Sequence, residues 1–149
     1  MSDALYAGDK LLDAWLALTS TLWNTRLVTS MTYNEAHVMG ILLRHSTPDA
    51  PMTATDLVRR TRLLKSQMNK LLSTLESKGF IVRRRAQSDR RMAYILLTPA
   101  GKTAYREEHV GVERILAELI YRLGADRALR VADDIGSIIA ILDDILPGD

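Results

Sequence analysis

Residues 65–101 decide the fold of this chain, and they read KSQMNKLLSTLESKGFIVRRRAQSDRRMAYILLTPAG. The first part repeats apolar residues at helical spacing, and Gly79 can adopt the left-handed conformation that ends a helix. A β-branched, basic run over residues 80–85 follows, and after a polar turn a second strand-like run covers residues 93–97. This segment is therefore predicted to be an amphipathic helix and an arginine-rich β-hairpin.

The positive charge of the chain is concentrated in the same region. Between Thr53 and Met92 there are eleven Lys and Arg residues and three acids, a balance of +8, whereas the remainder has a balance of −6. A basic middle between acidic ends is typical of a module that binds a polyanion. The alternative interpretation is a solvated charged face that has no partner.

Helical patterns precede this segment. Apolar spacing predicts one long helix over residues 4–27. Thr32 and Glu35 have the spacing of a capping box and predict a second helix that stops near Ser46. After a loop with two prolines, a short third helix is expected over residues 53–61.

The pattern becomes helical again after the hairpin. Thr98 can cap a helix that has Pro99 at its first position, and this helix is expected to continue through residue 121. An apolar stripe rich in isoleucine predicts a last helix over residues 125–146. Such a stripe cannot be buried by one helix alone, so the chain is expected to pair with a second copy about a two-fold axis.

The order of these elements predicts a mainly α chain with a small β-hairpin, an α+β fold of the winged helix-turn-helix type with N- and C-terminal dimerisation helices. We expect one compact domain, with a DNA-binding lobe over residues 31–98 and a helical dimerisation region over residues 1–30 and 99–149. A helix fits the major groove of B-DNA, and an arm beside it can reach the minor groove.

Two sets of side chains are the candidate DNA contacts. The helix beginning at residue 65 has a polar face opposite its apolar stripe, and this face can bond to base edges or phosphates. The residues expected in the major groove are Lys65, Ser66, Gln67, Asn69, Lys70 and Ser73. The residues of the wing expected to contact DNA are Arg84, Arg85, Asp89, Arg90 and Arg91. Adjacent arginines at a hairpin tip suit the negative potential of a narrow minor groove.

Two motifs resemble those of bacterial MarR-type transcriptional regulators, and the resemblance covers nearly the whole chain. Residues 89–91 (Asp-Arg-Arg) and 97–101 (Leu-Thr-Pro-Ala-Gly) are similar to the family's wing signature, and residues 71–79 resemble the end of its recognition helix. The resemblance implies that Arg91 enters the minor groove and that Asp89 orients it. It also implies a homodimer formed by the first, fifth and sixth helices, which acts as a repressor on double-stranded DNA.

The same resemblance implies release from DNA by a small phenolic or other anionic ligand. We expect such an anionic aromatic effector where the first, second and fifth helices meet. The candidate pocket residues are Trp15, Trp23, Arg26, Tyr33 and His37. Aromatic residues at helical spacing are also typical of an ordinary core, and this alternative stays open.

The turn before the recognition helix departs from the family pattern. The family tends to have Gly in the turn and Ser or Thr as the cap, whereas this chain has Arg62 and Leu64. A leucine cannot accept the N–H bonds of a helix start, and an arginine at positive φ is strained. A turn of different shape would shift the register of Lys65 and Ser66 on the helix.

An enzyme is not expected. The histidines, His37, His45 and His109, are far apart and share no motif with a pair of acids, so no catalytic arrangement is indicated. The chain has no cysteine, which excludes disulfides and thiolate metal sites, and no cofactor or metal is expected. Two alternatives remain: a metal-responsive regulator that uses the histidines with Glu107 or Glu108, and a winged-helix module that docks on proteins and binds DNA non-specifically.

No membrane segment is expected either. The longest stretch without a charged residue has 12 residues, from Ala14 to Thr25, whereas a helix needs roughly 20 to cross a bilayer. The first residues also lack the basic and apolar pattern of an export signal. The cytoplasm is therefore the expected location.

Overall fold

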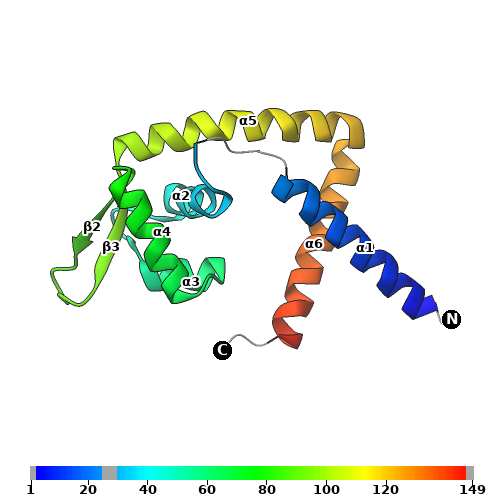
Figure 1. Cartoon of the computed structure of the whole chain (residues 1–149), viewed down its shortest axis with the longest axis horizontal. Coiled ribbons are helices and arrows are strands. Elements are labelled where there is room, and N and C mark those ends of the chain that lie inside the picture. Colours follow the sequence, from blue (N-terminus) through cyan, green and yellow to red (C-terminus); the bar gives the residue numbers. More distant parts are fainter. Residues whose placement is uncertain (1–2, 25–29, 147–149) are drawn as a thin grey trace. The chain divides into compact units, whose positions relative to one another are not determined.

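The computed structural model describes residues 3–24 and 30–146 of the chain, which divides into two compact units, Met1–Gly111 and Val112–Asp149. Within these ranges the fold is mainly helical with one small antiparallel sheet (Figure 1), which confirms the predicted class. The elements are α1 Asp3–Asn24, α2 Tyr33–His45, β1 Met52–Thr53, α3 Ala54–Thr61, α4 Lys65–Ser77, β2 Ile81–Arg85, β3 Ala93–Leu97, α5 Pro99–Leu123 and α6 Ala125–Ile145. The predicted end of the first helix, residues 25–27, lies outside the described residues.

Local side-chain bonds explain where two helices of the first unit begin. Thr32 Oγ1 accepts from the Glu35 N–H at 3.2 Å, and the Glu35 carboxylate accepts from the Thr32 N–H at 3.0 Å. The same reciprocal pair joins Thr53 and Asp56 at the start of α3. The backbone N–H of Thr53 holds the pKa of Asp56 below its ordinary value. The predicted capping box at Thr32 is therefore confirmed, as is the helix start at Thr53.

The sheet has the strand order β1-β3-β2, with every neighbouring pair antiparallel. The predicted hairpin is present, and its register pairs Arg83 with Ile95 and Arg84 with Tyr94. The third strand, β1, pairs Met52 with Ile95 and was not predicted. Two residues are too few to show the alternating pattern by which a strand is found in sequence. Because of β1, β3 is the central strand and is hydrogen-bonded on both sides, whereas β2 is an edge strand.

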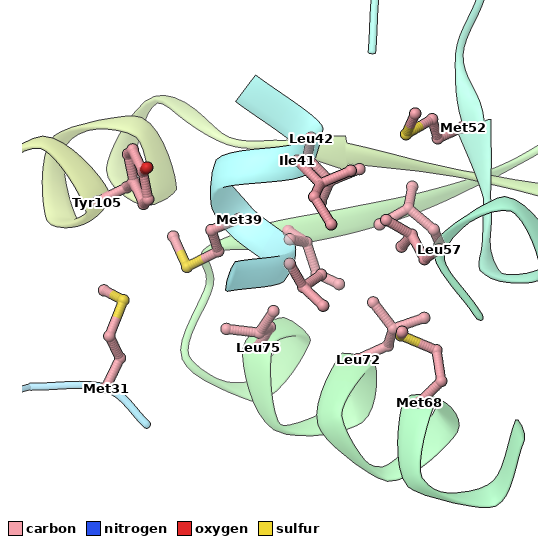
Figure 2. Packing of buried hydrophobic residues seen from close by; sticks show 13 residues of the cluster. Met31, Met39, Ile41, Leu42, Met52, Leu57, Met68, Leu72, Leu75 and Tyr105 are labelled. Carbon is pink, nitrogen blue, oxygen red and sulfur yellow. The ribbon is translucent and has the colours of Figure 1, made fainter. Parts of the chain in front are cut away.

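The core of the first unit lies between α2, α3, α4 and the sheet. Figure 2 shows Met68, Leu72 and Leu75 on one side of α4, turned toward side chains of α2 that include Met39. Met68, Leu72, Leu75 and Met39 are each fully buried, at 0% exposure. Burial of each such side chain contributes roughly 1.5–3 kcal/mol. The apolar stripe predicted for α4 is thus the face that packs this helix against α2, α3 and the sheet.

The start of α5 packs directly on the backbone that follows α4. The Thr98 N–H donates to the Phe80 carbonyl at 3.0 Å, and the Thr98 hydroxyl donates to the Gly79 carbonyl at 2.6 Å. The same hydroxyl accepts from the Gly101 N–H at 3.0 Å, which makes it the cap of the helix. A Cβ at position 101 would overlap the Phe80 carbonyl. The Leu-Thr-Pro-Ala-Gly motif therefore packs the start of α5 against the backbone of residues 79–80, and only glycine fits at the last position of the motif.

The first and last helices bury little. None of the 21 residues of α6 is buried, and residues 3–22 of α1 include no buried side chain. Large apolar side chains are exposed on both helices, among them Leu12 at 58% and Ile139 at 49%. None of the helices in the described ranges is long and apolar enough to cross a membrane.

Candidate nucleic-acid interface

The polar face of α4 is exposed over its whole length. All six residues predicted for the major groove are exposed, while the opposite face of the helix is buried in the core. These are Lys65, Ser66, Gln67, Asn69, Lys70 and Ser73. Because the buried stripe holds α4 in place, its polar face stays turned toward solvent. A rigid helix with one free polar face is what base recognition in the major groove requires.

Two of these six side chains also bond within the protein. The Gln67 side-chain oxygen accepts from the Leu64 N–H at 3.0 Å, and Ser73 Oγ accepts from Arg83 Nη2 at 3.3 Å. By contrast, Asn69 and Lys70 make no side-chain hydrogen bond or ion pair within the described ranges. Asn69 and Lys70 therefore keep their full bonding capacity for a ligand, whereas Gln67 and Ser73 have a structural use as well.

The turn before α4 has the unusual conformation that its sequence suggested. Arg62 adopts φ 59° and ψ 16°, in the left-handed region, and its N–H closes α3 by donating to the Val58 carbonyl at 2.9 Å. Leu64 occupies the N-cap position of α4 without a side-chain cap bond. Gln67 satisfies one backbone donor of this turn instead, and α4 still begins at the predicted residue, Lys65.

The tip of the wing is held by backbone bonds and one carboxylate. The Ala86 N–H donates to the Met92 carbonyl at 2.9 Å, and the Asp89 carboxylate accepts from the Arg91 N–H at 2.9 Å. Asp89 therefore shapes the turn through the backbone of the residue two positions later. All five predicted wing residues are exposed: Arg84, Arg85, Asp89, Arg90 and Arg91.

The remaining arginine of β2 has a different role, which the sequence analysis missed. Arg83 Nε lies 3.3 Å from Glu76 Oε2 as an ion pair, although that buried nitrogen makes no hydrogen bond within the described residues. With its bond to Ser73, Arg83 ties the wing to α4. Successive residues of a strand point to opposite faces, so the alternation of Arg83 with its neighbours was the available signal.

A second missed contact joins α2 to the end of α4. Lys78 Nζ donates to Glu35 Oε2 at 2.8 Å, and Glu35 is only 5% exposed. The same carboxylate completes the capping box at Thr32, so one buried acid serves two elements. The sequence indicated only the local half of this arrangement, because the two partners are 43 positions apart.

The predicted effector residues are placed only in part. Tyr33 and His37 lie one turn apart on α2 with ring centroids 5.9 Å from each other. Partial burial, and then the charge of Arg44, hold the pKa of His37 below its ordinary value. Trp15 is 49% exposed on α1, while the Trp23 side chain and Arg26 lie outside the described residues.

A polar cluster that was not predicted lies between α2 and the first half of α5. Arg44 Nη1 donates to the Tyr105 hydroxyl at 3.0 Å, and the Tyr105 ring stacks on His109 with centroids 5.2 Å apart. Gly40 leaves room for this approach, since a Cβ there would lie 2.8 Å from the Tyr105 hydroxyl. Among the described residues, no group of three or more His, Cys, Asp or Glu side chains is placed to hold a metal ion.

Comparisons with known proteins agree with this geometry. Residues 29–92 match the MarR family. Over 112 residues the chain is 29% identical to YwhA, an uncharacterized HTH-type transcriptional regulator of Bacillus subtilis (strain 168), and the match covers 74% of this chain and 81% of that protein.

Solved structures share the fold at low sequence identity. The transcriptional repressor CouR bound to a 23-mer DNA duplex superposes with a TM-score of 0.75 at 22% identity, over 89% of this chain and 91% of that one. The regulator PcaV from Streptomyces coelicolor, in complex with its natural ligand, gives a TM-score of 0.73 at 21% identity, over 94% and 96% of the two chains.

Proposed function

We propose that the chain is a homodimeric repressor of a palindromic operator in double-stranded DNA, because residues 29–92 match the MarR family and the chain is similar to an HTH-type transcriptional regulator. The observation that carries the proposal is the exposed polar face of α4 beside the arginine-rich hairpin. In the proposal α4 lies in the major groove and the tip of the wing reaches the adjacent minor groove.

Within α4, the side chains without an internal partner are the best candidates to read bases. An asparagine amide can bond to both N6 and N7 of adenine, and a lysine can bond to O6 and N7 of guanine. We assign these roles to Asn69 and Lys70. Lys65, Ser66, Gln67 and Ser73 complete the surface as contacts to phosphates or neighbouring bases.

The wing supplies the contacts that depend least on sequence. Arg84, Arg85, Arg90 and Arg91 are all exposed, and Asp89 holds the backbone of the turn that carries the last two. We assign Arg91 to the minor groove, where a narrow A·T-rich stretch concentrates negative potential. The other three arginines neutralise phosphates.

The exposed apolar faces of α1 and α6 support the dimer. Large apolar side chains are exposed on each of these helices, and exposed apolar surface of this kind marks an interface between proteins. Pairing about a two-fold axis presents two copies of α4, which bind half-sites about one turn of DNA apart. The operator is therefore a palindrome or close to one.

Release by a small anionic aromatic compound completes the proposal. The residues assigned to its pocket are Trp15, Trp23, Arg26, Tyr33 and His37. Arg44, two turns beyond His37 on α2 and bonded to Tyr105, offers a cation next to this group. That the related fold of PcaV was solved with its natural ligand supports this part of the proposal.

The test is to select the preferred sequence from random duplex DNA and to measure binding to it and to a scrambled duplex. Asn69→Ala and Lys70→Ala should each reduce the preference for the selected sequence by about 1–3 kcal/mol. Arg91→Ala should weaken binding to both duplexes and lower the salt dependence by about one unit.

Lys10→Ala, on α1, is the matched control and should leave DNA binding unchanged. Selection that returns no common sequence, or wild-type protein that binds both duplexes equally, would support the non-specific docking module instead. A selected sequence without two-fold symmetry would contradict the dimeric arrangement.

A further inference from the structure

A cavity of about 580 Å³ lies behind the wing, entirely within the first unit of the chain. It is bounded by the end of α2, the proline-containing loop after it, the sheet and the first turn of α5. By the strand register Arg84, Tyr94 and Leu96 share the face of the sheet opposite Arg83, which faces α4. These three residues line the cavity together with Arg85 and Leu97 from the ends of the two strands, and the cavity is partly open to solvent.

The charged residues that line this cavity are all basic. They are Arg84, Arg85 and Lys102, and no Asp or Glu is among the lining residues. Within the described ranges none of the three forms an ion pair with an acid. Three unpaired cations around one concave surface repel one another, and an anion bound between them would relieve that repulsion.

The rest of the lining is largely apolar. Leu43, Leu96 and Pro48 are among the apolar lining residues, and Tyr94, which also lines the cavity, has both an aromatic ring and a hydroxyl group. A cavity of 300–1,000 Å³ with apolar walls and a few convergent polar groups is the usual form of a small-molecule site. A free phosphate would leave these walls uncovered, whereas an anion with an apolar body would cover them.

We propose that this cavity binds an organic carboxylate with a compact apolar body, whose anionic group lies between Arg84, Arg85 and Lys102. The site is distinct from the pocket assigned to the effector near α1 and His37. Two of its cations are also wing residues of the proposed DNA interface, so the ligand and DNA compete for the same charges. This last consequence rests on the proposed function.

Calorimetric titration of the full chain with 2-naphthoate, without DNA, tests the site itself. Lys102→Gln should weaken binding about fivefold, which corresponds to the loss of one cation from a partly exposed site. Gln87→Trp, which narrows the cavity from the exposed turn, should weaken it further. Lys10→Gln, a lysine of α1 outside the cavity, is the matched control and should bind like the wild type.

Two other compounds separate the contributions of charge and apolar body. The neutral analogue 2-naphthamide and inorganic phosphate should each bind at least tenfold more weakly than 2-naphthoate. Amide NMR shifts on titration should concentrate at Tyr94, Leu96 and Lys102. Equal binding to wild type, Lys102→Gln and Gln87→Trp, equal binding of naphthamide, or shifts confined to other elements would each overturn the proposal.

The competition with DNA is tested by repeating the titration with a saturating duplex present. The affinity for 2-naphthoate should fall, and by linkage the ligand should lower the affinity for DNA by the same factor. Lys102→Gln should reduce this mutual effect while binding DNA normally in the absence of ligand. If the protein binds no duplex at all, the proposed function fails, and the titration without DNA still decides the cavity.

Discussion

Helices α4 and α6 are both amphipathic, but they bury their apolar faces to very different extents. The 13 residues of α4 include three that are fully buried, whereas none of the 21 residues of α6 is buried. The apolar residues of α4 find partners in α2, α3 and the sheet of the same chain. Those of α6, such as Ile135 and Ile139, remain 45% and 49% exposed. The winged lobe therefore buries its apolar faces within one chain, whereas the apolar face of α6 is left exposed, as the proposed dimer requires.

The largest effect should come from opening the core of the lobe. Leu72→Ala should lower the free energy of unfolding by roughly 3–4 kcal/mol, because a fully buried leucine leaves a cavity in close-packed surroundings. Urea denaturation measures it, and this loss should not depend on protein concentration. Ile139→Ala on α6 should instead lower stability to an extent that changes with concentration, since in the proposed dimer its contacts lie between chains. If both variants lost the same amount of stability at every protein concentration, the contrast between α4 and α6 would be wrong.

The second-largest effect on stability should come from adding a methyl group at Gly101, where the start of α5 packs on the Phe80 backbone. Gly101→Ala should destabilise the protein by about 2–3 kcal/mol, because the added Cβ overlaps the Phe80 carbonyl and backbone cannot easily move. Gly111→Ala, in the same helix with nothing within 4 Å, is the control. It should stabilise by about 0.5–1 kcal/mol through helix propensity alone. Thermal unfolding of both variants checks the opposite signs.

The ion pairs of the two units should differ in how much they contribute to the free energy of unfolding. Lys78→Gln should cost about 1–2 kcal/mol, because it leaves the buried Glu35 carboxylate without its cation while Lys78 itself stays partly in water. Arg122→Gln removes an exposed pair with Glu118 at 2.6 Å and should cost well under 1 kcal/mol. Denaturation with urea gives both values. A larger loss for Arg122→Gln would mean that its pair is buried in the dimer.

Relieving the backbone strain in the turn before α4 should make the protein more stable. Arg62→Gly should raise the free energy of unfolding by about 0.5–1 kcal/mol, because φ 59° carries no steric cost for glycine. Arg60→Gly, inside α3, should lower it by about 1 kcal/mol. Guanidinium titration compares the two, and a loss of stability in Arg62→Gly would show that the Arg62 side chain contributes more than its backbone strain.

The smallest effect should come from His37 as the pH falls. Its pKa in the folded chain lies below the ordinary value of 6.5, so the unfolded chain binds more protons and stability declines as pH falls below about 6.5. His37→Asn should lose this part of the decline while other acid-sensitive groups keep theirs. Unfolding curves at pH 7.5, 6.5 and 5.5 measure the difference, and parallel declines in the two proteins would contradict the assignment.

Elements that depend on neighbouring residues could be predicted from the sequence. The capping box at Thr32, the helix end at Gly79 and the hairpin each follow from residues within a few positions of one another. The strain at Arg62 could be predicted for the same reason. The exposed polar face of α4 could be predicted in the same way, since one stripe of apolar residues defines the face opposite it.

Only the tertiary structure decided which polar side chains of these elements have a partner within the protein. Arg83 looks like its neighbours in the sequence, yet its place in the register points it at Glu76 and Ser73. Lys78 meets Glu35 across 43 positions, and the cations behind the wing come together only because β2 and α5 meet beside the loop after α2. Patterns along a chain report spacing, whereas charge partners and cavities depend on which segments fold against one another.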